Sequence, residues 1–208
     1  ILVVNQSGGN ARSVAEHTFG LMLGLSRRML ECDRKMRRQL LQNREEVMGH
    51  EITGKTLGLV GIGQVGSQVA RIAPIFDMKV LACDPFVEPD EIRRRGAEPV
   101  DLDTLLAQSD VVSLHCPRDA GTLRMMNAQR YAQMKRGAMF ITTARGGIHD
   151  EDALAFGRRR AVRGEDDDAV DDSEGAHEGR DTSNIEVENT ATFAVPLVTG
   201  VMRQAKPI

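Results

Sequence analysis

A glycine-rich turn with the chemistry of a phosphate site begins at residue 61. The segment Gly61-Ile62-Gly63-Gln64-Val65-Gly66 follows the apolar run Thr56–Val60 and precedes a helical pattern. In this G-x-G-x-x-G spacing, Gly61 permits the tight turn, Gly63 lets a pyrophosphate approach the backbone, and Gly66 lets the helix pack against the strand. The helix N-terminus supplies N–H groups and a positive dipole end. The alternative is a tight turn in an unrelated α/β protein.

A carboxylate follows at the position where it discriminates between dinucleotides. Asp84 lies 18 residues after Gly66, at the end of the second apolar run, Lys79–Cys83. A carboxylate there accepts hydrogen bonds from the adenosine ribose hydroxyls and repels the 2′-phosphate of NADP. The turn and Asp84 together predict NAD as the cofactor.

The elements that position these residues alternate between strand and helix. Strands are predicted at residues 56–60, 79–83, 111–114 and 138–142, and helices at 64–76, 88–95, 102–108 and 124–134, with a further helix opening at 150–156. Such alternation is typical of βαβ units with a parallel sheet covered on both faces. The fold class expected is α/β, with a Rossmann-type doubly wound parallel sheet.

A long helix is predicted before this sheet, over residues 14–41, with Asn10 or Ser13 as its cap. Its apolar face includes Met22, Met29 and Met36 and is broader than one sheet face needs, so the chain is expected to be dimeric or aggregation-prone. The second half of the helix is basic. That face either binds phosphates or is a solvated face balanced by acidic residues.

Composition limits the classes of function. The chain has 208 residues, 41% hydrophobic, with a net charge of −3, which disfavours nucleic acid as a partner. It contains no apolar run of about 20 residues and no visible signal peptide, so no membrane segment is expected. Cys32, Cys83 and Cys116 are expected to be reduced thiols of a cytoplasmic protein. Because Ile1–Val4 resembles the tail of a strand, the chain is expected to be a fragment.

The composition changes after residue 157. Residues 158–183 are rich in arginine and then in aspartate and glutamate, with few apolar side chains, so a loop or disordered segment is expected. An acidic cluster is also a candidate for a divalent cation, but the ligands have no regular spacing. No metal site is predicted.

Further segments resemble the D-2-hydroxyacid dehydrogenase family, which includes phosphoglycerate dehydrogenases and glyoxylate/hydroxypyruvate reductases. They match in order and spacing up to about residue 156, and comprise Asn5–Asn10, Ser13–His17, Ser113–Pro117 with Thr122, Met134–Ala138, Thr143–Gly147 and Asp150–Leu154.

The resemblance implies an NAD-binding domain inserted into a separate substrate domain. Residues 1–10 are then a hinge from the substrate domain, 11–195 the NAD-binding domain, and 196–208 the start of the return. The resemblance also implies a homodimer and a small 2-oxo or 2-hydroxy acid as substrate. Arg145 takes the place of the family's catalytic arginine, which holds the substrate carboxylate. Positions matched to cofactor contacts are Gly61, Gly63, Gln64, Val65, Gly66, Asp84, His115, Cys116, Pro117, Thr143, Ala144 and Arg145, with Gln6 less firmly matched.

The resemblance decays beyond residue 156. Glu174 aligns with the family's catalytic glutamate, or is one more solvated acid, and Ala169 stands where the family has an aspartate. Alignment on Phe193 puts Ala194 at the catalytic histidine, whereas alignment on Pro196 and Gly200 puts Leu197 there. His115, although close to the cofactor in the motif, belongs to a His-x-Pro turn rather than to proton transfer.

Without an imidazole, hydride transfer is expected to be impaired, because general acid–base catalysis typically contributes about 10²–10⁴-fold. Two interpretations remain. In one, this is an enzyme sequence truncated at both ends and disturbed after residue 156, as a reading error would disturb it. In the other, the chain is a non-catalytic, NAD-sensing binding module.

Overall fold

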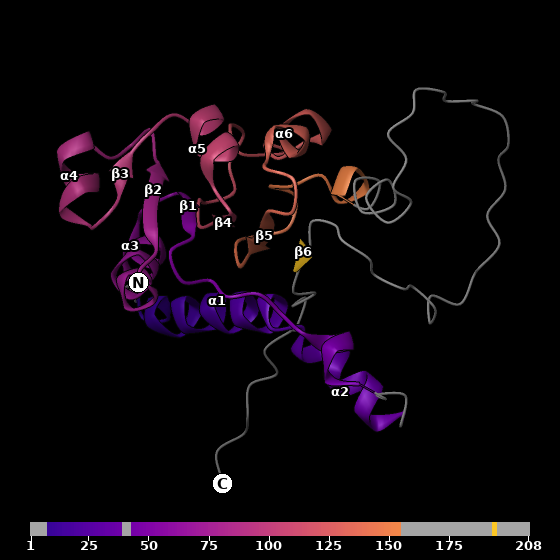
Figure 1. Ribbon diagram of the computed structural model, residues 1–208. Helices are drawn as coiled ribbons and strands as arrows, with labels where there is room; N and C mark the ends of the chain where they lie inside the picture. Colours follow the sequence, from indigo (N-terminus) through magenta and orange to yellow (C-terminus); the bar gives the residue numbers. More distant parts are fainter. Residues whose placement is uncertain (1–7, 39–42, 155–192, 195–208) are drawn as a thin grey trace, which may run out of the picture.

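The computed structural model describes residues 8–38, 43–154 and 193–194 (Figure 1). Within these residues lies a six-stranded sheet in the order β3-β2-β1-β4-β5-β6, and every neighbouring pair is parallel. Its strands are β1 (Thr56–Val60), β2 (Lys79–Cys83), β3 (Glu98–Pro99), β4 (Val111–Leu114), β5 (Met139–Thr142) and β6 (Phe193–Ala194). The predicted Rossmann-type doubly wound parallel sheet is confirmed.

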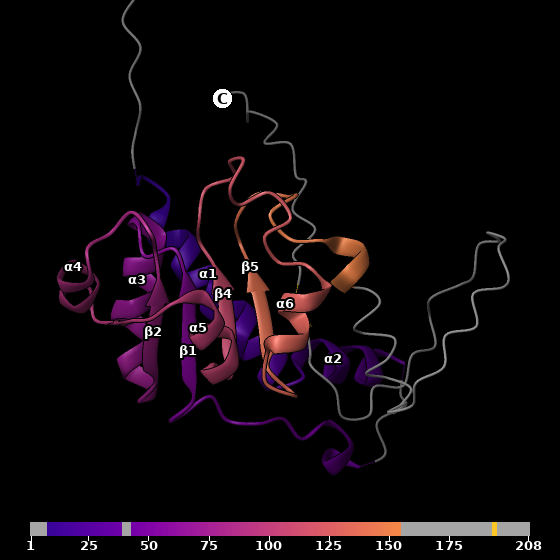
Figure 2. The same ribbon diagram turned by 90° about the horizontal axis from the view of Figure 1, so that it is seen from above.

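Helices cover both faces of the sheet, as Figures 1 and 2 show. On one face, α1 (Ala11–Ser26) packs along α3 (Gln64–Ile72), which the 3₁₀ turn η2 (Ala73–Phe76) extends. On the other face, α5 (Leu102–Gln108) packs beside α6 (Ala128–Gln133). Two shorter helices, α2 (Met29–Arg37) and α4 (Pro89–Arg94), lie at the periphery, and the 3₁₀ turn η1 (Arg44–Val47) precedes the sheet.

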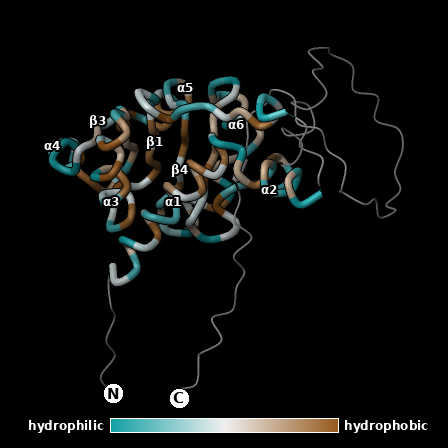
Figure 3. The backbone as a smooth tube through the Cα atoms, turned by 60° about the horizontal axis from the view of Figure 1, so that its bottom comes forward, coloured by the Kyte–Doolittle hydropathy of each residue, from teal (hydrophilic) through white to brown (hydrophobic). Residues whose placement is uncertain are grey.

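Alternation along the strands divides the core into two layers. Leu57 and Leu59 belong to the cluster under α1 and α3, whereas Val60 belongs to the cluster under α5 and α6. Successive strand residues point to opposite faces, so a strand covered on both sides is apolar throughout. Figure 3 shows this as hydrophobic strands between helices with hydrophilic outer surfaces. A Cβ on Gly58 would meet the Leu105 and Ser109 side chains, so α5 lies directly against β1.

The prediction of one helix over residues 14–41 is wrong. Arg28 adopts left-handed backbone angles, with φ 51°, and separates α1 from α2. A bidentate pair with Glu31, at 2.8 and 2.7 Å, holds the Arg28 side chain. The N–H of His50 donates to the carbonyl of Ser26, the last residue of α1. Asn10 occupies the N-cap of α1, but its side chain makes no capping hydrogen bond.

The predicted helix at 124–134 begins later, at Ala128. The Asn127 side chain caps it by accepting a hydrogen bond from the Arg130 N–H at 3.1 Å. Just before this cap, Met126 pairs with His149 in a parallel bridge. That pairing of distant residues takes the first four residues out of the helix. The helix predicted from residue 150 is present at 151–154, and residues 158–183 lie outside the described part of the chain.

None of the described helices is both long enough and apolar enough to cross a membrane.

Candidate functional site

The predicted site residues follow the carboxyl ends of neighbouring strands. β1 lies between β2 and β4, so the chain order reverses on the two sides of β1. At such a switch point the loops diverge and leave a crevice beyond the carboxyl ends of the strands, where open α/β sheets bind ligands. The glycine turn follows β1, Asp84 follows β2, the segment His115-Cys116-Pro117 follows β4, and Thr143-Ala144-Arg145 follows β5. The structure therefore brings all four segments to one edge.

The three glycines of the turn have different steric surroundings. Gly61 has φ +93°, and a Cβ there would stand 2.8 Å from the Cys116 nitrogen. A Cβ on Gly66 would collide with the Gly61 carbonyl oxygen. A Cβ on Gly63, in contrast, would have no heavy atom within 4 Å. Gly61 and Gly66 are thus required by the fold, whereas Gly63 leaves open space directly at the N-terminus of α3.

Asp84 is tied to this turn by its own carboxylate. Its Oδ2 accepts a hydrogen bond from the Ile62 N–H at 2.9 Å, and its Oδ1 accepts one from the Phe86 N–H at 3.0 Å. These bonds hold the carboxylate at the rim of the crevice. It therefore lies where a dinucleotide seated on the turn would place its adenosine ribose.

His115 connects the ends of β4 and β5. Its Nε2 lies 3.0 Å from the Ser113 hydroxyl and its Nδ1 lies 3.4 Å from the Thr143 hydroxyl. Burial lowers the pKa of His115 to about 4. The ring is consequently neutral at pH 7 and is not an imidazolium acid. That His115 is a structural part of its turn stays a prediction.

Arg145 is exposed at the same edge, in the turn that follows Thr143 and Ala144. Gly147, two residues later, has φ +84°, which returns the chain toward the Met126–His149 bridge. The exposed guanidinium lies beside the crevice, and its planar fork matches the geometry of a carboxylate.

Of the other predicted residues, Glu174, Leu197 and Gln6 lie outside the described part of the chain. Ala194 lies within β6, in register with Ile141 of β5. Ala194 is the last residue of β6, and the alignments that put the catalytic histidine at position 194 or at position 197 both stay predictions.

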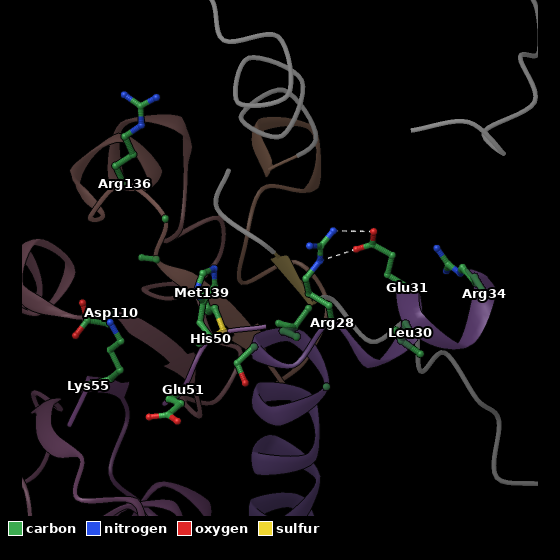
Figure 4. Close-up of a pocket in the computed structure, with 15 residues that line it drawn as sticks. Arg28, Leu30, Glu31, Arg34, His50, Glu51, Lys55, Asp110, Arg136 and Met139 are labelled. Carbon is green, nitrogen blue, oxygen red and sulfur yellow. Dashed lines mark hydrogen bonds and ion pairs between the residues drawn. The ribbon is translucent and has the colours of Figure 1, made fainter. Parts of the chain in front are cut away.

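A separate hollow of about 620 Å³ lies at the opposite, amino end of the strands. Figure 4 shows it between the end of α1, α2 and the residues Lys55, Asp110 and Met139. The basic face of α2 borders it, but Arg28 and Lys35 pair with Glu31, and Arg37 pairs with Asp33. These contacts favour the interpretation of a solvated face balanced by acids over a phosphate site.

Sequence reasoning missed two contributors to the crevice. Arg95, at the end of α4, donates a hydrogen bond to the Ile62 carbonyl at 2.6 Å. Ser113, on β4, contacts the His115 ring. Arg95 stands in a run of three arginines, which looks like a solvated helix end, and nothing in the local pattern distinguishes it from Arg93 and Arg94.

Comparisons with known proteins give concordant results. Residues 19–161 match the model for the D-isomer specific 2-hydroxyacid dehydrogenase family, NAD binding domain. A D-3-phosphoglycerate dehydrogenase of Archaeoglobus fulgidus is 43% identical over 154 residues, covering 74% of this chain and 29% of the relative. A hydroxypyruvate reductase of Thermotoga maritima is 40% identical over 154 residues, covering 74% of this chain and 49% of the relative.

Among solved structures, a D-lactate dehydrogenase from Aquifex aeolicus, complexed with NAD and lactic acid, superposes with a TM-score of 0.69 at 36% identity. The match covers 75% of this chain and 46% of that one. The chain thus spans between about three tenths and one half of the length of these relatives.

Proposed function

The chain belongs to the D-isomer specific 2-hydroxyacid dehydrogenase family, matching its NAD-binding domain, and we propose from this premise that it is the cofactor half of an enzyme acting on a small 2-hydroxy or 2-oxo acid. One observation carries the proposal. The open space at Gly63, at the N-terminus of α3, lies on the same turn that Asp84 contacts. The space for a pyrophosphate and the carboxylate for a ribose therefore lie next to each other.

In this proposal each segment of the crevice has a role in holding the dinucleotide. The amides at Gly63, Gln64, Val65 and Gly66 face the pyrophosphate, and Asp84 accepts hydrogen bonds from the adenosine ribose. The residues after β4 and β5, from His115 to Pro117 and from Thr143 to Ala144, line the rest of the crevice through backbone and small side chains. NAD supplies the hydride acceptor when bound.

Arg145 is the proposed substrate-binding cation. Its guanidinium would hold the carboxylate of a 2-oxo acid bidentately and orient the carbonyl toward the cofactor. Among these residues the proton that accompanies hydride transfer has no imidazolium donor, because burial lowers the pKa of His115 to about 4 and keeps its ring neutral at pH 7. Glu174 remains the proposed second catalytic residue. We therefore propose that NAD binding is retained and that turnover by this chain is impaired.

The proposed organisation keeps residues 11–195 as the cofactor domain, with residues 1–10 and 196–208 leading from and to a substrate domain. The compartment proposed is the cytoplasm. That proposal rests on the three cysteines, which are all unpaired thiols in the structure.

Selectivity for NAD over NADP tests the proposed cofactor site. Hydrogen bonds to a carboxylate are worth about 1.5–3 kcal/mol, so NADP is expected to bind roughly 10- to 100-fold more weakly than NAD. Asp84→Ala should narrow this gap, and so should Asp84→Asn, which removes the charge together with one of the two oxygens that accept from the Ile62 and Phe86 N–H groups. Calorimetric titration of both dinucleotides measures the ratio. NADP binding as tight as NAD in the parent chain would refute the role of Asp84.

A homodimer through α2 is the proposed assembly. Met22, which the sequence pattern offered for this interface, is fully buried in the core, but Met29, Leu30 and Met36 are 54%, 66% and 62% exposed. In Figure 1, α2 extends away from the sheet, and the described part of the domain leaves these side chains largely exposed. A second copy laid against α2 and the neighbouring hollow would bury them.

Sedimentation at micromolar concentration tests this assembly. The chain is expected to sediment as a dimer, and Leu30→Asp should convert it to a monomer, because a charge buried without a partner destabilises an interface. Ile75→Asp is the matched control, since Ile75 is 77% exposed on η2, away from α2. A monomeric parent chain, or equal effects of the two substitutions, would count against the interface.

A further inference from the structure

The peptide groups around Ile62 are held from two sides by side chains that come later in the sequence. Asp84 accepts the hydrogen bond of the Ile62 N–H at 2.9 Å, and Arg95 donates to the Ile62 carbonyl at 2.6 Å. Ile62 itself is fully buried. Buried backbone groups require partners, and here both partners of a residue between two glycines are charged side chains.

Such anchoring matters because the turn is otherwise adaptable. Gly61 already has φ +93°, and an added Cβ at Gly63 would meet no heavy atom within 4 Å. Glycine gives the backbone access to many conformations. Restricting these conformations when a ligand binds costs affinity. A turn that is fixed beforehand keeps its amides aimed at one point in space.

Arg95 is itself fixed before it reaches the turn. Its Nε donates to Glu91 Oε1 at 2.8 Å, one helical turn back along α4. The same hydrogen bond lowers the pKa of Glu91, so the carboxylate stays charged well below neutral pH. The guanidinium therefore donates two hydrogen bonds, from Nε to the Glu91 carboxylate and from Nη1 to the Ile62 carbonyl.

The two neighbouring arginines point elsewhere. Arg93 pairs with Asp90 at 2.9 Å and Arg94 pairs with Glu91 at 3.0 Å. Their side chains are 52% and 74% exposed, against 31% for Arg95. Arg94 therefore offers a cation next in sequence to Arg95 whose contacts are with Glu91 and Asp90 instead of the turn.

We propose that Arg95, oriented by Glu91, is a positioning residue that holds the glycine turn in its dinucleotide-binding conformation through the Ile62 carbonyl. The inference rests on the proposed NAD-binding function and deepens it. Asp84 also has a proposed task at the ribose, whereas both Arg95 bonds are made within the protein.

Three variants of the whole chain separate the effect of the Arg95 hydrogen bond from the effect of a positive charge near the end of α4. Arg95→Met removes the hydrogen bond and the charge. Arg94→Met removes a neighbouring charge and its ion pair with Glu91, but it leaves both Arg95 bonds in place. Arg95→Lys keeps the charge and one donor. Hydrogen–deuterium exchange of a peptide spanning the turn, without NAD, reports its rigidity. Calorimetry with NAD reports affinity.

Arg95→Met is expected to speed exchange in the turn and to raise the Kd for NAD about tenfold. Arg95→Lys should restore part of both effects, and Arg94→Met should match the parent. Unchanged exchange in Arg95→Met, or equal effects of Arg94→Met, would overturn the inference. If the parent chain failed to bind NAD, the proposed function would fall, while the exchange comparison would still decide whether Arg95 holds the turn.

Discussion

Replacing Gly63 by valine is expected to abolish NAD binding while the fold remains intact. The position is exposed, and a Cβ there meets no heavy atom within 4 Å. The added Cβ therefore meets nothing in the described part of the domain, while the isopropyl group fills the space that a pyrophosphate needs. Two lost hydrogen bonds to a charged group, each worth about 1.5–3 kcal/mol, weaken binding by roughly 100-fold or more.

The other glycines of the turn provide the contrast. Gly61→Val should destabilise the domain itself, since φ +93° is strained for a β-branched residue and the Cys116 nitrogen is 2.8 Å from the added Cβ. Gly66→Val should do the same through the Gly61 carbonyl. A single motif thus separates into two residues required for folding and one required for the ligand.

The matched control is Gly20→Val. Gly20 lies in α1, is exposed, and also has no heavy atom within 4 Å of an added Cβ. Thermal unfolding should be similar for this variant, the parent and Gly63→Val, and calorimetry should show NAD binding to be lost in Gly63→Val alone. Parent-like affinity in Gly63→Val would mean that the glycine turn is not the binding site.

How far the sequence predicts the fold depends on how local the cause is. The helix at 102–108 and the strand at 111–114 have the predicted bounds, because Asp101 caps the helix and Ser109 ends it within the same segment. The break at Arg28 was missed because no glycine or proline marks it. It depends on the Glu31 ion pair and on contact with His50, which lies far along the chain.

The same distinction applies to the site. The glycine turn and Asp84 are recognisable from spacing, because their roles follow from backbone sterics and from strand ends. Arg95 is separated from Ile62 by 33 residues, and its bond forms only when α4 is folded against the turn. Sequence periodicity carries no information on such a contact.

The largest expected effect on chemistry is the absence of turnover. Reduction of a 2-oxo acid requires a bound cofactor, a cation for the carboxylate, and a proton donor at the carbonyl oxygen. In the proposed function the glycine turn with Asp84 provides the first and Arg145 the second. Neither Ala194 nor Leu197 is able to donate a proton. NADH oxidation with glyoxylate, hydroxypyruvate or pyruvate is therefore expected to be at or near background.

Two additions together should restore activity. The first is a substrate domain, for example that of the hydroxypyruvate reductase of Thermotoga maritima, joined to this chain. The second is Leu197→His. The domain alone should leave turnover low, and the histidine should raise it about 10²–10⁴-fold. Ala194→His tests the other alignment, because Ala194 ends β6 in register with Ile141.

The absorbance of NADH follows each reaction, and calorimetry confirms that every variant still binds the cofactor. Turnover by the present chain on the order of 1–10³ per second would contradict the expectation and would place the proton on another group, with Glu174 and His177 as the candidates. Arg145→Lys in the restored protein then separates binding from chemistry. Lysine keeps the charge but not the bidentate fork, so KM should rise and kcat should fall together. Restored turnover that is indifferent to Arg145 would remove it from the substrate site, even though the proton donor had been correctly identified.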